Sequence, residues 1–400
     1  MGHHQKFEDV IASPFARNRA LLADVKAGQE PIDMTIGEPR HGMPSFVSDV
    51  LAEHVAGFEK YPPIPGTPGL RLSIGGWMKR RYPGLAGIAD LDSLILPLNG
   101  TREGLFSAAF SAVNRRSFDE KPVFLMPNPF YQVYVAGSMA AGGRAVFLPA
   151  VEEKGFLPDL DALDENILKQ TAAFYLCSPS NPEGAVADKA YLEKAIQLAR
   201  KYDFMLFSDE CYSEIYFDAA PAGALEVAYG IDATFKNVVA FNSLSKRSNL
   251  PGLRSGFVAG DENFMRSYSQ FRNVACPQVP LPVQHVSEKV WNEEKHVETN
   301  RQLYREKFLL TKDLLGSVVP INIPSGGFFI WLNMKEFGGS EVMTETLWKE
   351  SGVKVLPGAY LAHQDGTGFN PGVDYIRIAL VQDIDITREA LKRICSVLCK

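Results

Sequence analysis

Short apolar runs alternate with amphipathic stretches through the middle of the chain. Seven of these runs have the length and composition of buried strands: Leu94–Leu98, Val123–Met126, Ala145–Leu148, Ala172–Cys177, Phe204–Ser208, Val238–Phe241 and Gly256–Ala259. Amphipathic stretches such as Asp188–Tyr202, which has two basic residues near its end, separate several of them. Because strands that are buried on both faces are apolar along their whole length, this alternation predicts crossover units and an α/β fold with a mainly parallel, seven-stranded sheet.

The last hundred residues follow a different pattern, which is typical of a smaller α+β domain. We expect a long charged helix at about Val283–Leu315, strands at Gly326–Leu332 and Tyr375–Leu380, and a helix at about Ile386–Val397. A further helix near Pro14–Ala27 is expected to join this domain. The chain then divides into residues 1–55 as an N-terminal segment that joins the small domain, residues 56–290 as the large domain, and residues 291–400 as the small domain.

The amino-acid composition argues against nucleic acids and membranes as partners of this protein. Hydrophobic residues make up 46% of the 400 residues and charged residues 22%, which is ordinary for a globular protein with a large core. The formal net charge of −6 argues against a nucleic-acid partner, because phosphate affinity needs a basic face. No apolar run approaches the roughly 20 residues of a membrane span, so we expect no membrane association.

Cysteine usage and the first residues point to a cytoplasmic protein without a metal site. The five cysteines are widely spaced and form no C-x-x-C pair, which fits reduced thiols and makes a structural zinc site improbable. The opening Met-Gly-His-His resembles neither a signal peptide nor a transit peptide. We expect His3 and His4 to belong to a frayed terminus and not to a metal site.

The segment after the sixth apolar run carries the strongest chemical signal. It reads Phe-Asn-Ser-Leu-Ser-Lys-Arg-Ser-Asn-Leu-Pro-Gly-Leu-Arg-Ser-Gly and places Lys246 beyond a strand end, where open α/β sheets bind ligands. A lysine amine forms an imine with an aldehyde cofactor. Ser243, Ser245 and Arg254 are suited to hold a phosphate by hydrogen bonds and charge. A basic surface loop would have the same local spacing, so this motif needs support from other segments.

Three other strand ends carry polar groups of different kinds. Asn181 precedes a proline, which keeps its backbone extended so that its side chain can point into a site. Asp209 ends a buried strand, where a carboxylate is costly unless it meets a cation or a donor, and Tyr212 follows three residues later. Gly100 opens a helix whose free N–H groups suit a phosphate. A plain turn, an N-cap aspartate and an ordinary helix start are the alternatives, but all four ends should meet at one edge of the sheet.

Together, and in this order, the motifs resemble the class I/II aminotransferases, which are pyridoxal 5′-phosphate (PLP) enzymes of fold type I. Ser-Leu-Ser-Lys with an arginine eight residues later resembles the family's lysine signature, Ser-Pro-Ser-Asn-Pro-Glu-Gly its Asn-Pro motif, and Asp-Glu-Cys-Tyr its Asp-x-x-Tyr motif. The resemblance covers nearly the whole chain. It implies a large PLP-binding domain, a smaller α+β domain and amino-group transfer between amino acids and 2-oxo acids.

The resemblance also implies a role for each matching residue. Lys246 would bind the cofactor covalently and later move a proton between substrate and cofactor, while Asp209 would pair with the pyridine nitrogen. Asn181 and Tyr212 would bond to the phenolic oxygen of the ring, and Tyr131 would stack on the ring. The residues implied for the phosphate are Gly100, Thr101, Arg102, Ser243, Ser245 and Arg254.

Substrate and subunit contacts are implied in the same way. Arg377 resembles the arginine that binds the substrate α-carboxylate bidentately, and Gly37 resembles the glycine beside that carboxylate. Tyr61, in Tyr-Pro-Pro-Ile-Pro-Gly, resembles the segment that enters the phosphate site of the neighbouring subunit. The implied assembly is a homodimer with shared active sites. Ser180 and Glu183 depart from the asparagine and threonine often found in the family.

Longer strings resemble N-succinyl-diaminopimelate aminotransferases of proteobacteria; they are residues 127–132, 208–218, 243–261, 300–308 and 355–362. This implies N-succinyl-LL-2,6-diaminopimelate as donor and 2-oxoglutarate as acceptor, in lysine biosynthesis. The distal carboxylate of such a donor needs a second cation, for which Arg272 is our first candidate and Arg40 our second.

Other functions remain open to different degrees. An aminotransferase for another amino acid, or a PLP-dependent lyase of the same fold, would share the cofactor motifs. A PLP-dependent transcription regulator is disfavoured, because the enzyme-like body starts almost at the first residue and the chain is acidic. A nicotinamide dehydrogenase is disfavoured because no strand precedes a G-x-G-x-x-G motif.

Overall fold

The computed structural model describes residues 12–400, in which the seven apolar runs form one sheet. The strand order is β2-β8-β7-β6-β5-β3-β4. The bounds are β2 Ile95–Leu98, β3 Val123–Asn128, β4 Arg144–Pro149, β5 Thr171–Cys177, β6 Met205–Asp209, β7 Val238–Ser243 and β8 Gly256–Gly260. The α/β fold with a mainly parallel, seven-stranded sheet is therefore confirmed.

The direction of the strands gathers the polar motifs at one edge. Strands β4, β3, β5, β6 and β7 are parallel to one another, whereas β8 runs antiparallel to both β7 and β2. Leu98 at the end of β2 and Ser243 at the end of β7 both pair with Gly256 at the start of β8. The carboxyl ends of β2, β5, β6 and β7 consequently lie along the same edge of the sheet.

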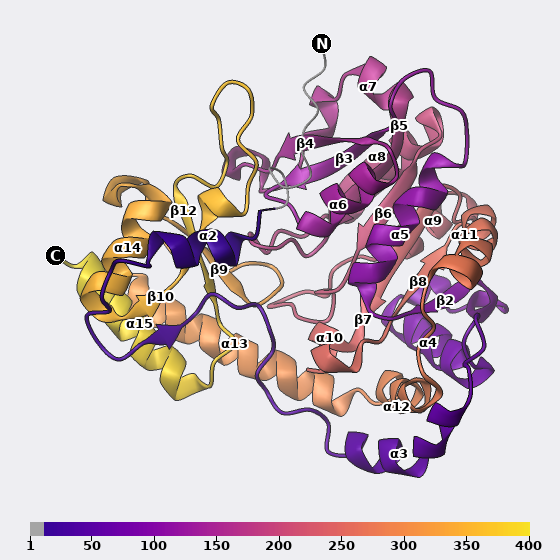
Figure 1. The fold of residues 1–400 in the computed structure, drawn as a ribbon, viewed down its shortest axis with the longest axis horizontal. Helices are drawn as coiled ribbons and strands as arrows, with labels where there is room; N and C mark the ends of the chain where they lie inside the picture. The colour runs from indigo at the N-terminus through magenta and orange to yellow at the C-terminus, as the bar shows by residue number, and fades with distance from the viewer. Residues whose placement is uncertain (1–11) are drawn as a thin grey trace.

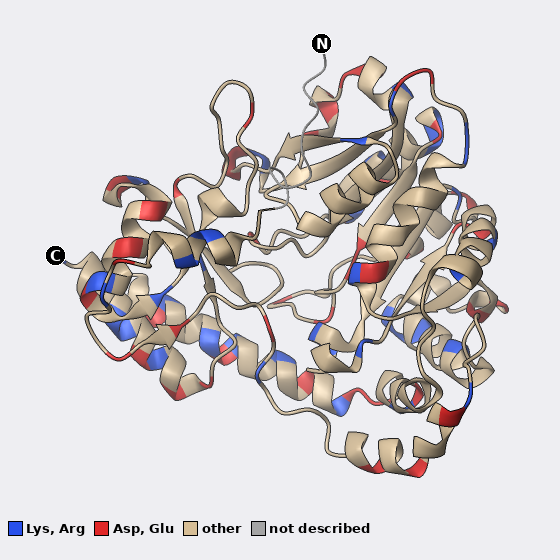
Figure 2. Cartoon of the chain, viewed as in Figure 1, with Lys and Arg blue, Asp and Glu red and all other residues tan. Residues whose placement is uncertain are grey.

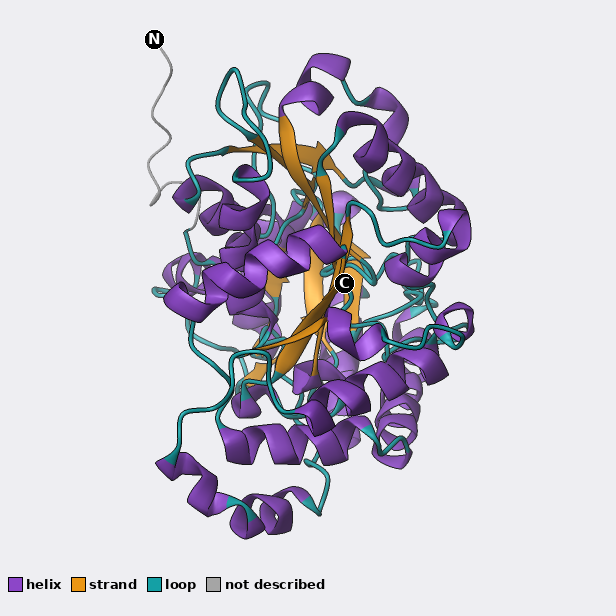
Figure 3. Cartoon of the chain, turned by 90° about the vertical axis from the view of Figure 1, so that its right-hand side faces the viewer, coloured by secondary structure: helices purple, strands orange, loops and turns teal. Residues whose placement is uncertain are grey.

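Helices cover both faces of this sheet, as Figures 1 and 3 show. Successive strand residues such as Val123 and Phe124 belong to separate apolar cores, one on each face. The core that contains Val123 includes residues of α4 Pro68–Arg81, α8 Lys189–Tyr202, α9 Ala224–Asp232 and α12 Leu281–Trp291. The opposite core includes residues of α5 Thr101–Val113, α6 Gln132–Ala140 and α11 Glu262–Ala275.

A second unit with its own core surrounds a three-stranded antiparallel sheet in the order β11-β12-β9. Its strands are β9 Phe329–Asn333, β11 Leu356–Pro357 and β12 Tyr375–Ala379. Its helices are α13 Lys295–Leu315, α14 Gly339–Ser351 and α15 Ile384–Leu398. Near the amino terminus, α2 Pro14–Leu21 packs on β11, and β1 Ile32–Asp33 pairs with β10 Val353–Lys354.

The chain crosses between the two units after β1. Residues 34–46 lead from β1 in the second unit towards α3 Val47–Glu53, which packs on α12 of the large unit. Figure 1 shows this crossing segment in indigo, passing across α13 towards α3. Gly37, which was predicted to lie beside a substrate carboxylate, therefore belongs to a strap of chain that is part of neither the large nor the three-stranded sheet.

Two helix predictions were wrong in their bounds. The expected helix at 283–315 is broken into α12 and α13, because the Glu293 carboxylate accepts hydrogen bonds from the backbone N–H groups of Lys295 and His296 and so starts a new helix. The buried guanidinium of Arg247 donates to the carbonyl of Val290 at 3.2 Å and occupies the break. The expected helix at 14–27 ends at Leu21.

The shortening of that first helix has a tertiary cause. Trp348 on α14 donates from its indole nitrogen to the carbonyl of Val25 at 2.8 Å, and Gly28 N–H donates to the carbonyl of Trp348 at 3.1 Å. The backbone of residues 25–28 thus hydrogen-bonds to α14 and not to a continuing helix.

The surface carries both signs of charge, which Figure 2 shows interspersed along the outer helices. Within residues 12–400, no helix is both long enough and apolar enough to cross a membrane. His3 and His4 lie outside the described residues.

Candidate active site

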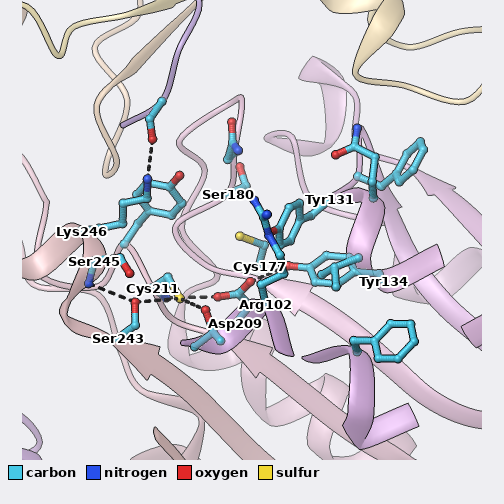
Figure 4. A pocket seen from close by; sticks show the side chains of 18 of the residues that line it. Arg102, Tyr131, Tyr134, Cys177, Ser180, Asp209, Cys211, Ser243, Ser245 and Lys246 are labelled. Carbon is cyan, nitrogen blue, oxygen red and sulfur yellow. Dashed lines mark hydrogen bonds between the residues drawn. The ribbon is translucent and has the colours of Figure 1, made fainter. Parts of the chain in front are cut away.

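A cavity of about 1240 Å³ opens at the carboxyl edge of the large sheet. It is lined from both units: Asp209, Ser243 and Lys246 come from the large unit, whereas Phe329 and Arg377 come from the small one. Figure 4 shows Lys246 on the left, Asp209 and Arg102 in the centre, and Tyr131 and Tyr134 to their right. The four strand ends singled out in the sequence all contribute to its wall.

Lys246 lies on a single helical turn directly after β7. Ser243 caps that turn, α10 Leu244–Arg247, by accepting a hydrogen bond from the backbone N–H of Ser245. The Lys246 amine donates to the carbonyl oxygen of Gly37. Burial lowers the pKa of Lys246 to about 8, and the positive charges of Arg377 and Arg102 act in the same direction. A substantial fraction of this amine is therefore neutral, and nucleophilic, near neutral pH.

The start of α5 forms an anion site with Arg254. Gly100 has a φ of 79°, and no side chain caps the helix, so its first N–H groups point into the cavity. A Cβ atom at Gly100 would collide with the Arg254 guanidinium, so only glycine allows this approach. Arg102, Ser243 and Ser245 line the same part of the cavity.

Asp209 is a buried carboxylate that has donors but no basic side chain within ion-pair distance in the described chain. Tyr134 donates from its hydroxyl to Asp209 Oδ2 at 2.8 Å, and Cys211 donates from its backbone N–H to Oδ1 at 3.3 Å. Burial raises the pKa of Asp209, against the effect of these hydrogen bonds. The carboxylate is 5% exposed and faces the cavity, where it is suited to a cationic heterocycle.

Tyr131 and Tyr212 stand on different sides of the cavity. Tyr131 begins α6, and its hydroxyl accepts a hydrogen bond from Arg102 Nε at 2.7 Å. Tyr212 packs edge-on against Phe328 and Phe329 of the small unit, and the Lys246 amine lies 5.9 Å from the centre of its ring. Burial raises the pKa of the Tyr212 hydroxyl, which keeps it a donor.

Arg377 is buried on β12 of the small unit. Its Nη1 donates to Asn181 Oδ1 at 3.0 Å and its Nη2 to the carbonyl of Thr35 at 2.7 Å, while its Nε has no partner among residues 12–400. Burial lowers the pKa of Arg377 to about 10. A buried guanidinium with a free donor and no carboxylate beside it is suited to an acidic group of a ligand.

Four predicted residues do not line this cavity: Gly100, Arg272, Arg40 and Tyr61. Arg272 is 3% exposed and pairs with Glu103 at 2.6 Å, so the structure assigns it a partner within the fold in place of a substrate acid. Arg40 bonds to Gln382 at 2.7 Å. Tyr61 is 98% exposed.

Sequence reasoning missed two groups in the wall. Tyr134, which holds Asp209, follows Tyr131 at helical spacing, and that pattern is equally typical of a core position. Glu183 is 8% exposed, lines the cavity and has no partner for Oε1. Burial raises the pKa of Glu183 to about 7. One sign of Glu183 was available in the sequence, which is that it departs from the residue often found at this place in the family's Asn-Pro motif.

The residues that line the cavity fit PLP. The start of α5 with Arg254 suits a phosphate, the cation-free carboxylate of Asp209 suits a pyridinium nitrogen, and the partly neutral amine of Lys246 suits an aldehyde. Within residues 12–400, no group of three His, Cys, Asp or Glu side chains is placed to hold a metal ion.

Comparison with known proteins gives a consistent result. Residues 29–394 match the family model "Aminotransferase class I and II". An LL-diaminopimelate aminotransferase of Syntrophobacter fumaroxidans is 30% identical over 382 residues, which is 93% of each chain. The solved structure of an aminotransferase from Neisseria meningitidis is similar with a TM-score of 0.90 and 38% identity over 96% of each chain. The aminotransferase AspB from Helicobacter pylori has a TM-score of 0.87 and 32% identity, over 96% of this chain and 97% of its own.

Proposed function

This chain belongs to the class I and II aminotransferases, which depend on PLP, and we propose that it transfers an amino group from a donor of the diaminopimelate type to a 2-oxo acid. The donor that the sequence strings favour is N-succinyl-LL-2,6-diaminopimelate, with 2-oxoglutarate as acceptor. The names of relatives at 30% identity favour the free LL-diaminopimelate instead. Both reactions belong to lysine and diaminopimelate biosynthesis.

The observation that carries the proposal is the paired geometry of Arg377 and Lys246. The guanidinium of Arg377 is buried, and its Nε has no partner among residues 12–400. It would bind the α-carboxylate of an amino acid or a 2-oxo acid. The Lys246 amine also lines the cavity and donates to the carbonyl of Gly37, which lines it too. A substrate held by its carboxylate at Arg377 would thus have its α-carbon near a basic amine.

The chain's own groups divide the work between binding and proton movement. When bound, PLP supplies an aldehyde and an electron-accepting ring. Arg377 and Asn181 orient the substrate carboxylate, and Asp209 provides the negative charge that keeps a ring nitrogen protonated. Lys246 Nζ, with its lowered pKa, would accept the proton from the substrate α-carbon and would then donate it to the cofactor.

The distal end of the donor is held by a group that this chain alone does not identify. The cationic side chains in the cavity wall are Arg102, Lys246, Arg254 and Arg377, each of which has a role already. Arg272 would reach a substrate only by leaving Glu103. A cation from the neighbouring subunit, or Arg40 released from Gln382, is therefore the better source of a distal contact.

A homodimer with shared sites is part of the proposal. The segment around Tyr61 exposes three large apolar side chains: Val55 at 56%, Phe58 at 57% and Tyr61 at 98%. Exposed apolar groups so close together in the chain are typical of a subunit interface. In such a dimer Tyr61 would donate its hydroxyl to the phosphate in the partner's site.

The test is a transamination screen of the purified holoenzyme with 2-oxoglutarate as acceptor. We expect the highest kcat/KM with N-succinyl-LL-diaminopimelate, compared with free LL-diaminopimelate, aspartate and an aromatic amino acid. A tenfold preference for the free donor would move the assignment to the relatives' reaction. A tenfold preference for an aromatic or uncharged donor would refute the diaminopimelate class, and release of ammonia without glutamate would indicate a lyase.

A further inference from the structure

A buried chain of hydrogen bonds lies beside the active site and is built by Lys307, His41 and Asn300. Lys307 Nζ bonds to His41 Nε2 at 2.7 Å, and His41 Nδ1 bonds to Asn300 Oδ1 at 2.6 Å. Lys307 and Asn300 are each 2% exposed and lie two turns apart on α13. His41 belongs to the strap that crosses between the two units.

Both ends of this chain reach backbone that carries active-site side chains. Lys307 Nζ also donates to the carbonyl of Leu380 at 3.1 Å, three residues beyond Arg377. Asn300 Nδ2 donates to the carbonyl of Lys246 at 3.4 Å. His41 lies four residues after Gly37, whose carbonyl accepts the Lys246 amine. The Lys307 amine therefore links the crossing strap, through His41, to the segment that follows β12, through Leu380. His41 and Asn300 extend this link to the turn that carries Lys246.

When Lys307 is protonated, the hydrogen-bonding capacities allow one arrangement of the protons. The ammonium group only donates, so His41 Nε2 accepts and the ring is neutral with its proton on Nδ1. That proton is donated to Asn300 Oδ1, which turns the Asn300 amide nitrogen towards the Lys246 carbonyl. Burial lowers the pKa of His41, in agreement with a neutral ring. In this arrangement every hydrogen bond has a fixed donor and acceptor: Lys307 donates to His41, His41 to Asn300, and Asn300 to the carbonyl of Lys246.

An ammonium group is a costly choice for this position. Burying a charge without a hydrogen-bonded carboxylate is unfavourable, and burial lowers the pKa of Lys307 to about 8, against the effect of the Asp383 carboxylate. A methionine would fill the same volume without that cost. What the amine adds is a pair of directed hydrogen bonds to two separate segments, His41 and Leu380, and these fix the distance between them.

We propose that Lys307 and His41 are positioning residues that hold Gly37 and Arg377 at the separation a substrate carboxylate needs. The pair touches neither the cofactor nor the substrate and acts through the strap and through β12. This inference rests on the carboxylate subsite proposed for Arg377 and Gly37.

The experiment compares the holoenzyme with its Lys307→Met variant, which keeps an unbranched side chain one heavy atom shorter but removes its donors. KM and kcat are measured for the amino donor and for 2-oxoglutarate, and the affinity for succinate, an unreactive dicarboxylate, is measured from the absorbance of the bound cofactor. We expect KM for both substrates and Kd for succinate to rise about tenfold, with kcat changed less than about threefold and PLP affinity unchanged. Lys312→Met is the matched control, since Lys312 is exposed on the same helix.

Unchanged KM and succinate affinity in Lys307→Met, or an equal effect in the control, would overturn the positioning role. If Arg377→Lys weakens succinate binding while Lys307→Met does not, the carboxylate subsite stands and only the positioning role fails. If neither variant weakens it, the subsite itself is wrong. Should Lys307→Met not fold, His41→Asn decides by the same measurements, because His41 is partly exposed and lies outside helices and strands.

Discussion

The guanidinium of Arg377 donates to the side-chain oxygen of Asn181 at 3.0 Å, and this bond joins β12 of the small unit to the loop after β5 of the large one. The two residues are 196 positions apart in the chain. Since the second Nη group holds the carbonyl of Thr35, both ends of the guanidinium are fixed, while its buried Nε has no partner among residues 12–400.

Replacing Arg377 by lysine should therefore remove carboxylate binding and leave cofactor binding intact. A lysine has one compact charge and does not reproduce the planar fork that holds Asn181 and Thr35 together. We expect KM for donor and acceptor to rise by about 100-fold, which corresponds to about 2.7 kcal/mol. Steady-state kinetics with Arg388→Lys, an exposed arginine of α15, as control provide the test. Unchanged KM values would show that the carboxylate binds elsewhere.

Cofactor capture by the apoenzyme should depend on pH through Lys246. Its pKa is lowered to about 8 by burial, so the neutral amine gains population up to that pH and then stays constant. The rate of imine formation with added PLP should rise about tenfold per pH unit below pH 8 and level off above it. Stopped-flow absorbance measures this rate. A midpoint near 10.5, the value of an ordinary lysine, would contradict the lowered pKa.

Gly100→Ala should weaken PLP binding. A methyl group there would collide with the Arg254 guanidinium, and the φ of 79° is unfavourable for alanine. We expect the dissociation constant of PLP to rise by at least about tenfold, as measured by fluorescence titration of the apoenzyme. Gly252→Ala is the matched control, because a Cβ atom at Gly252 meets open space. Equal affinities for the two variants would mean that Arg254 does not need to approach the helix.

Glu183→Gln should stabilise the protein at alkaline pH. The pKa of Glu183 is raised from 4.5 to about 7 by burial, so the folded state keeps a proton that the unfolded chain has already lost in this range. Stability contributed by the neutral acid is therefore lost as the pH rises from about 4.5, and the loss is complete above about pH 7. Glutamine does not titrate, so the variant should be more stable than the wild type by about 1 to 3 kcal/mol at pH 8 and much less so at pH 4.5.

Denaturant unfolding at both pH values measures this difference. Glu298→Gln on the exposed face of α13 serves as the control and should show no such dependence on pH. A pH-independent difference for Glu183→Gln would mean that the carboxyl is ionised throughout the range.

Two inactive variants should complement each other if the sites are shared. Mixing Lys246→Ala subunits with Tyr61→Phe subunits gives heterodimers in which one site has both native residues and the other has neither. The specific activity of the mixture should exceed the mean of the two separate variants, and sedimentation should report dimers. A fully active monomer, or a mixture that stays at the mean, would refute the shared site.

Local pattern predicted the large sheet because each strand is a self-contained apolar run bounded by polar turns. Lys246, Asp209, Asn181 and Gly100 could be singled out since each follows such a run directly, and parallel strands bring their carboxyl ends to one edge. The helix bounds were less predictable. At the break before α13, Glu293 starts the new helix, and Arg247, which comes from a distant turn, fills the gap.

The sequence by itself determined the sheet, the residues at its carboxyl edge and, through their order, the resemblance to the family. Only the tertiary structure decided which distant groups meet: Arg272 with Glu103, Tyr134 with Asp209, and Lys307 with His41. The physical reason is that a strand end is specified by neighbours in the chain. A contact between residues such as Lys307 and His41, 266 positions apart, depends instead on how whole helices and sheets pack against each other.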